Sequence, residues 1–225
     1  MAESQTFVPF TPYDPGCSPT EASAQMLAMM QARRSVRFFS DRPVERTVIE
    51  NIVATAGTAP SGAHKQPWRF VAVQDPEIKR QVRVAAEEEE KAFYSGRASE
   101  RWLQDLAPFG TNSEKPYLEV CPWLIVVFKL VRDDRPDADS DQVYYVNESV
   151  GIATGMLISA IHNAGLSTLT HTPSPMKFLA EVLGRPEYER PYLLLPIGYP
   201  ADDCVVPELD RKPLDEILVV DRGEG

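Results

Sequence analysis

The chain has 225 residues, and its 23 basic and 33 acidic residues give a formal net charge of −10. With 43% hydrophobic residues it can bury one substantial core, and its length lies within the range of single domains. The negative charge argues against a nucleic-acid partner, because no basic stripe is available to displace counterions from a phosphate backbone. We therefore expect a single domain, residues 1–225, that does not bind nucleic acid.

Cysteine spacing and the lack of a long apolar run exclude further classes. Cys17, Cys121 and Cys204 are an odd set without C-x-x-C spacing, so neither a disulfide framework nor a metal site is expected. No run approaches the roughly 20 apolar residues of a membrane span, and residues 1–4 lack the features of a secretory signal. These features predict a soluble, cytoplasmic protein with no membrane partner.

The first half of the chain predicts a proline-rich arm followed by helices and one strand. Residues 1–19 contain closely spaced prolines and form an extended arm. A capped helix follows over 20–31, and a second helix covers 44–57, where a glycine stops it. The β-prone run 68–73 is predicted as a strand, and an Asp-Pro pair then begins a long helix over 75–94.

The second half predicts three strands alternating with helices. Residues 123–128 form a continuous apolar run, which indicates a central strand covered on both faces. Residues 143–164 form a long helix rich in small residues, so we expect it to pack closely against another element. A strand over 166–171, a helix over 172–184 and a strand over 192–197 complete the core.

Two segments outside this core are predicted to be irregular. Residues 132–141 are charged and turn-rich, which indicates a surface loop. Residues 199–225 contain spaced prolines and little periodicity, so they form a second arm. Two arms around a mixed α/β core indicate a chain that exchanges its ends with a partner subunit.

The cluster Arg33-Arg34-Ser35-Val36-Arg37 is unusual in so acidic a chain. Guanidinium groups match phosphate oxygens, and an adjacent hydroxyl adds another donor, so the cluster suits a phosphate monoester. Alternatively, cations at the end of a helix over 26–31 would stabilise the negative pole of its dipole. The cluster alone leaves both interpretations open.

Several segments, in their order and spacing, carry a family resemblance. The arginine cluster, residues 57–64 with the following Pro67-Trp68, and residues 195–200 resemble the FMN-dependent nitroreductase superfamily. Residues 87–94, Lys115 and residues 170–173 are similar to the iodotyrosine deiodinase family within it. The resemblance runs from about residue 30 to residue 220.

The fold implied by the resemblance is α+β, a nitroreductase-like three-layer α/β/α sandwich. Two copies would form a domain-swapped homodimer that binds FMN at its interface and is wrapped by the arms 1–19 and 199–225. Animal members of the family carry an N-terminal membrane anchor. No such segment is recognised in this sequence, so the resemblance implies a soluble, bacterial member.

The resemblance also assigns residues to the cofactor, FMN. The implied contacts come from Arg33, Arg34, Ser35, Val36, Arg37, Pro60, Ser61, Gly62, Thr170, His171, Thr172 and Arg211. The residues by themselves allow simpler interpretations: residues 60–62 as a tight connection, Arg211 as a solvated charge, and His171 as a packed side chain.

Thr172 is the catalytic residue that the resemblance implies. In the family, a threonine hydroxyl at this place donates a hydrogen bond to the flavin N5 nitrogen, which favours one-electron transfer over hydride transfer. Without that context, a threonine before Pro173 is an ordinary helix start. Met176-Lys177-Phe178 and His171 depart from the vertebrate pattern, which leaves the redox tuning open.

Glu90, Tyr94 and Lys115 are the implied substrate-binding residues. Glu90 and Tyr94 are spaced i,i+4, so they share one helix face. A carboxylate and an ammonium can clamp the zwitterion of an amino acid, and the amide of Ala63 would face the phenolate oxygen. A single glutamate of an acidic run otherwise belongs to a solvated face.

The function implied is reductive removal of iodide, or another halide, from halotyrosines, with electrons from NAD(P)H directly or through a reductase. The alternative within the same fold is a general NAD(P)H-dependent nitroreductase or quinone reductase with an open, apolar pocket. A third alternative is a flavin-free dimer in which the arginines are structural.

Overall fold

The computed structural model describes residues 7–221, which divide after Arg33 into two units. The first unit contains α1 (Pro19–Gln31). The Ser18 hydroxyl accepts the Glu21 amide at 3.3 Å, and the Glu21 carboxylate accepts the Ser18 amide at 3.0 Å. This reciprocal cap, followed by a proline in the first turn, begins the helix one residue before the predicted start.

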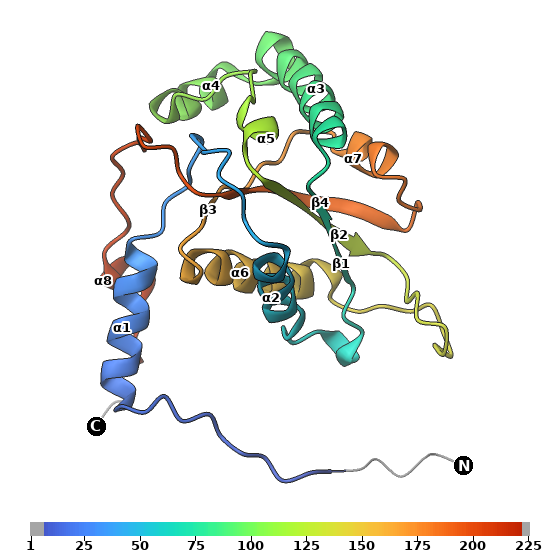
Figure 1. Cartoon of the computed structure of the whole chain (residues 1–225). Coiled ribbons are helices and arrows are strands. Elements are labelled where there is room, and N and C mark those ends of the chain that lie inside the picture. Colours follow the sequence, from blue (N-terminus) through green and yellow to red (C-terminus); the bar gives the residue numbers. More distant parts are fainter. Residues whose placement is uncertain (1–6, 222–225) are drawn as a thin grey trace. The chain divides into compact units, whose positions relative to one another are not determined.

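The second unit contains, within its described residues, an antiparallel sheet of four strands (Figure 1). Across the sheet these are β1 (Trp68–Val73), β2 (Trp123–Leu130), β4 (Glu189–Gly198) and β3 (Ser167–Thr168). Every pair of neighbours runs antiparallel. β2 is therefore central, as the apolar run at 123–128 predicts.

β2 is buried on both of its faces. Ile125 and Val127 belong to one hydrophobic core, whereas Leu124, Val126 and Phe128 belong to another. Successive side chains of a strand point to opposite faces, so the sheet separates the two cores. The prediction of a strand covered on both sides is confirmed.

One face of the sheet is covered by α2 (Arg46–Gly57) and α6 (Val146–Asn163), which pack against each other (Figure 1). Their buried side chains include Ile52, Ala56 and Leu157. Ala153 is fully buried in this core, so the small residues of α6 allow the close packing that the sequence predicts.

The opposite face is covered by α3 (Pro76–Ala92), α5 (Tyr117–Val120) and α7 (Lys177–Val182). Val82 of α3 and Leu179 of α7 are fully buried in the second core. Helices on both faces of a central sheet form a three-layer α/β/α sandwich, which confirms the predicted fold class.

Several short elements go beyond the predicted ones. They are η1 (Gly62–His64), the π-helical turn η2 (Phe93–Arg97), α4 (Glu100–Leu106), η3 (Ala107–Phe109) and α8 (Leu214–Ile217). Three of them, η2, α4 and η3, follow α3 directly in the chain, whereas the sequence predicted only that the long helix ends near residue 94. No helix in the described part of the chain combines the length and apolar character needed to cross a membrane.

Two predicted elements are wrong in extent. The strand predicted over 166–171 is reduced to β3, although His171 forms a separate bridge with Leu194. The helix predicted over 172–184 begins only at Lys177. The bridge at His171 holds the backbone extended, so a helix cannot begin at the next residue.

Gly198, the last residue of β4, marks a close approach to Pro122. A Cβ at position 198 would lie 2.6 Å from Pro122 Cδ. A proline ring cannot rotate away, so we expect Gly198→Ala to lower the free energy of unfolding by about 1–3 kcal/mol, measured by urea unfolding. Gly57→Ala is the control, because an added Cβ there meets no described atom within 4 Å. Equal stability of the two variants would contradict this view of the packing.

Candidate functional site

A cavity of about 240 Å³ lies where the end of α3 meets the segments around Lys115 and His171. Many of the predicted site residues line it: Arg37, Glu90, Tyr94, Lys115, Thr170, His171 and Thr172. The cavity thus brings together the predicted substrate residues Glu90, Tyr94 and Lys115 with the threonine segment. Phe93 and Trp102, which the sequence did not single out, add an edge-to-face aromatic pair with ring centroids 4.8 Å apart.

Glu90 and Lys115 form an ion pair in the lining of this cavity. Lys115 Nζ lies 3.4 Å from Glu90 Oε2, and the two side chains are only 3% and 14% exposed, respectively. The same ammonium lies 5.7 Å from the centroid of the Tyr94 ring. The solvated-face alternative for Glu90 is therefore wrong, because this carboxylate is largely buried beside a cation.

Burial acts against the charge of both partners. It raises the pKa of Glu90 above the ordinary value, although the Lys115 charge works in the opposite direction. It lowers the pKa of Lys115, and here the Glu90 charge opposes the shift. Desolvation is the largest influence on each pKa, so burial of the pair contributes little net stability. Lys115 Nζ also donates to the Asn112 carbonyl and lies 3.4 Å from the Thr111 hydroxyl.

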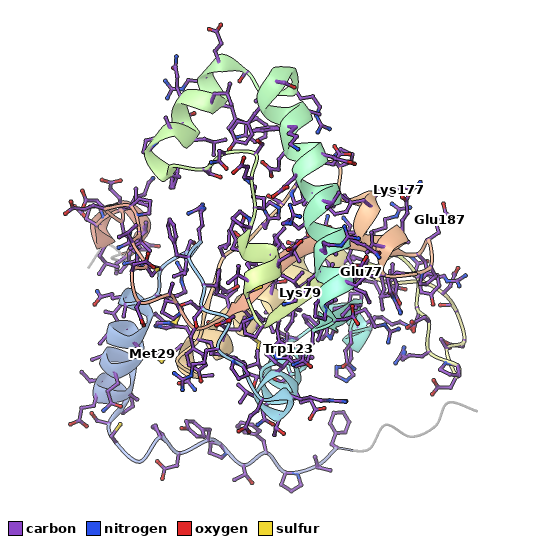
Figure 2. The ribbon with its side chains drawn as sticks, turned by 45° about the horizontal axis from the view of Figure 1, so that its top comes forward. Met29, Glu77, Lys79, Trp123, Lys177 and Glu187 are labelled. Carbon is purple, nitrogen blue, oxygen red and sulfur yellow. The ribbon has the colours of Figure 1, made fainter. Side chains whose placement is uncertain are left out.

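α3 holds the Lys115 segment from both of its ends. Lys79, near the beginning of α3 (Figure 2), donates to the carbonyl oxygens of Glu119 at 2.9 Å and Cys121 at 2.7 Å. Farther along α3, the Glu87 carboxylate accepts the backbone N–H of Lys115 at 2.7 Å. The position of the lysine therefore depends on the same helix that carries Glu90.

The segment around His171 alternates between exposed and buried residues. Thr170 and Thr172 are exposed, whereas His171 and Pro173 are buried. The backbone of His171 exchanges hydrogen bonds with Leu194 of β4, at 2.8 Å and 3.1 Å. This extended pairing places the two threonines on the side opposite the buried histidine. The alternative interpretation of Thr172 as a helix start is wrong.

The His171 ring is enclosed. Its Nδ1 lies 3.5 Å from the Tyr117 hydroxyl, and its Nε2 has no hydrogen-bond partner among residues 7–221. Burial, reinforced by the charges of Lys115 and Arg37, lowers the pKa of His171 to about 3. The ring is therefore neutral around physiological pH, in agreement with its interpretation as a packed residue.

The arginine cluster lies mostly in the second unit and extends the sheet. Ser35 forms a parallel bridge with Thr168 of β3, and the Val36 amide donates to the Thr168 carbonyl at 3.2 Å. The Arg34 guanidinium donates to the carbonyl of Pro207 in the C-terminal segment. Arg33 ends the first unit, and the last turn of α1 contains no basic residue, which does not favour the dipole interpretation.

The loop at 60–66 lies elsewhere, beside the beginning of α6. Its Gly62 amide donates to the Ser149 hydroxyl at 3.3 Å, and a Cβ on Gly62 would lie 2.8 Å from the Tyr144 carbonyl. α6 covers the face of the sheet opposite α3, so Pro60, Ser61, Gly62 and Ala63 do not line the cavity in the same chain. Arg211 is also outside it.

This loop adopts an unfavourable backbone conformation. Ala63 and His64 have φ angles of 48° and 54°, in the left-handed region that side chains disfavour. Lys65 Nζ anchors the loop by donating to Asp133 at 2.9 Å. Asp133 also accepts two hydrogen bonds from the Arg135 guanidinium, at 2.9 Å and 2.6 Å.

Asp133 is a site residue that the sequence does not indicate, since it lies in residues 132–141, predicted as a surface loop. Its carboxylate is buried, and the hydrogen bonds from Arg135 and Lys65 hold its pKa below the ordinary range. The sequence does not indicate Tyr117 either. No local pattern identifies either role, because Lys65, which Asp133 anchors, and His171, which Tyr117 contacts, are more than 50 positions away in the chain.

Residues 30–199 match the model of the Nitroreductase family, and the chain belongs to this family. It is 54% identical to the iodotyrosine deiodinase of Haliscomenobacter hydrossis, over 98% of this chain and 100% of that protein. Human iodotyrosine deiodinase 1 is 46% identical over 88% of this chain and 68% of that protein.

A solved structure supports the same relationship. Oxidised iodotyrosine deiodinase bound to FMN and 3-iodo-L-tyrosine superposes with a TM-score of 0.76 at 28% identity. The match covers 89% of this chain and 99% of that one. The predicted nitroreductase-like fold is thereby confirmed.

The neutral, buried His171 makes folding depend on pH. Between its ordinary pKa of 6.5 and its folded value of about 3, the unfolded chain binds more protons, so stability falls as the pH falls. This linkage amounts to about 2 kcal/mol at pH 5. His171→Phe cannot be protonated and should lose less stability than the parent between pH 8 and pH 5, measured by urea unfolding.

His64→Gln is the control for this experiment. It removes an exposed histidine instead of a buried one, so only a change specific to His171→Phe is assigned to the buried ring. If His171→Phe follows the parent between pH 8 and pH 5, the assignment of a buried neutral imidazole is wrong.

Proposed function

We propose that this protein is an FMN-dependent reductive dehalogenase that removes iodide from iodotyrosine and accepts related halotyrosines. The observation that carries the proposal is the largely buried Glu90–Lys115 pair, with Tyr94 beside it and Thr170 to Thr172 in the same cavity. A general nitroreductase pocket has no need for two opposite buried charges. Identity of 54% to an iodotyrosine deiodinase agrees with this specificity.

FMN fits the chemistry of the residues present. Arg34 and Arg37 carry guanidinium donors on either side of the exposed Ser35 hydroxyl, a set suited to a phosphate and a polar ring edge. Thr170 and Thr172 add exposed hydroxyls at the cavity wall. When bound, FMN supplies the electrons that reduce the carbon–halogen bond. Two electrons and one proton replace iodide by hydrogen on the ring.

The clamp residues bind and orient the amino acid. Glu90 accepts hydrogen bonds from the substrate ammonium, and Lys115 donates to the substrate carboxylate. Tyr94 encloses the same zwitterionic end of the substrate. With FMN bound, the Thr172 hydroxyl would donate to the flavin N5 nitrogen, and the Ala63 amide of a second copy would donate to the phenolate oxygen. These contacts would orient the substrate beside the cofactor and exclude water.

Two copies of the chain form the working enzyme. Residues 60–63 lie beside α6, on the opposite face of the sheet from α3, so a second copy is needed to bring such a loop to the cavity. Both terminal segments expose large apolar side chains, including Tyr13 at 88% and Val219 at 93%. These side chains suit the arms of a homodimer that wrap around a partner subunit.

NAD(P)H is the proposed electron source, either directly or through a reductase. The three cysteines are free thiols, which suits a reducing compartment, and we assign the protein to the cytoplasm on that basis. Arg33, which follows α1, and Arg211, in the arm 199–225, complete the proposed phosphate contacts.

Anaerobic turnover tests the function. The purified protein should be yellow, and under dithionite it should convert 3-iodotyrosine to tyrosine and iodide, measured by chromatography. If iodotyrosine is not consumed while nitroaromatics are reduced with NADPH, the general nitroreductase alternative is correct. A colourless protein that does not take up added FMN would support the flavin-free alternative.

Glu90→Gln tests the clamp. The amide keeps the shape of the side chain but cannot pair as an anion with the substrate ammonium, so halotyrosine affinity should fall about 10- to 100-fold. The measurement is quenching of FMN fluorescence by 3-iodotyrosine. FMN content should remain that of the parent.

Glu88→Gln is the matched control for Glu90→Gln. Glu88 belongs to the same acidic run but is exposed, so its variant should bind halotyrosine like the parent. Unchanged affinity in Glu90→Gln, or an equal loss in both variants, would remove the clamp from the proposal.

A further inference from the structure

Three segments that carry the proposed site meet at three buried rings. Phe39 follows the arginine cluster, Tyr117 lies two residues after Lys115, and His171 lies between the two threonines. All three side chains are buried. None of these rings is a proposed contact of the substrate, yet each belongs to a segment that contributes such a contact or a flavin contact.

The rings contact one another in a row. The Phe39 and Tyr117 centroids are 6.5 Å apart with their planes tilted by 44°. Tyr117 and His171 are 6.1 Å apart at 89°, an edge-to-face arrangement. The Tyr117 hydroxyl lies 3.5 Å from His171 Nδ1. Tyr117 is therefore the middle of a contact that links all three segments.

The paired backbone at His171 sets which way the neighbouring side chains point. Its backbone is extended and paired with Leu194, so consecutive side chains alternate between the two sides. The His171 ring lies on the buried side, and Thr170 and Thr172 lie on the exposed side. A ring held firmly inside therefore fixes the orientation of Thr172 outside.

The histidine is a costly core residue. Its Nε2 is buried with no hydrogen-bond partner in the described part of the chain, which is unfavourable for a polar atom. The cost of this buried nitrogen means that core packing alone does not explain an imidazole here. The contact of the ring with Tyr117, two residues after Lys115, offers another reason for its presence.

We propose that His171, packed on Tyr117, is a positioning residue that sets Thr172 against the flavin and couples it to the Lys115 side of the substrate clamp. The inference rests on the proposed function. It assigns no chemical step to His171, whose ring acts through its neighbours. Removal of the ring should disturb Thr172 and Lys115 together, although both residues remain in the chain.

Three variants of the FMN-loaded enzyme test the proposal: His171→Ala, His171→Phe and Thr172→Ala. The main readout is the difference between the first and second reduction potentials of bound FMN, with and without 3-iodotyrosine. A hydrogen bond to N5 changes these two potentials unequally, so Thr172→Ala defines the effect of losing it. Affinity for 3-iodotyrosine, FMN content and melting temperature are measured in parallel.

His171→Ala should reproduce the change in potentials seen in Thr172→Ala, and it should weaken 3-iodotyrosine binding about fivefold, the factor that one ordinary hydrogen bond provides. His171→Phe keeps a ring against Tyr117 and should remain close to the parent in both measurements. If His171→Ala does not fold, Tyr117→Leu removes the ring contact from the other side and should give the same result.

A purely structural role gives a different outcome. The melting temperature of His171→Ala would then fall, while the potentials and the affinity of the folded, FMN-bound protein would equal those of the parent, and the proposal would be overturned. The parent separates this failure from that of the proposed function. If the parent itself neither binds nor dehalogenates 3-iodotyrosine, the proposed function is wrong.

Discussion

The burial of β2 on both faces is the constraint on which the rest of this protein depends. Its alternate side chains enter two different cores, so helices must cover both sides of the sheet. One side carries α3 and the clamp, and the other carries α6 and the loop at 60–66. Under the proposed function, pairing of two chains is therefore a consequence of the topology, because each chain separates residues that must meet around one flavin.

The clamp shows how this scaffold favours binding over stability. A buried ion pair contributes little net stability, because desolvation offsets the attraction between its charges. Desolvation is the largest influence on the pKa of both Glu90 and Lys115, and it acts against the charge of each. A ligand with an ammonium and a carboxylate supplies a partner to each. The same arrangement would reject neutral aromatic compounds, which offer neither charge.

Periodicity and stop residues predicted most elements of the fold, and they failed where a contact distant in sequence decides the local structure. β2 and α6 follow from apolar and small-residue patterns that need no partner to be recognised. Thr172 before Pro173 has every local feature of a helix start, but pairing of His171 with Leu194 keeps the chain extended. Glu90, Tyr94 and Lys115 were found through a family resemblance, and their approach in space supports that choice. Asp133 had no signal, since its role depends on Lys65.

The anchoring of the loop at 60–66 by Asp133 has a consequence for sequence variation in the family. A charged, turn-rich stretch such as 132–141 would ordinarily tolerate insertions, because loop closure depends only weakly on length. Here a longer stretch would shift the carboxylate that restrains Lys65 and would release a backbone held in a left-handed conformation. Natural variants should therefore conserve the length of the loop at 132–141 more strictly than its composition.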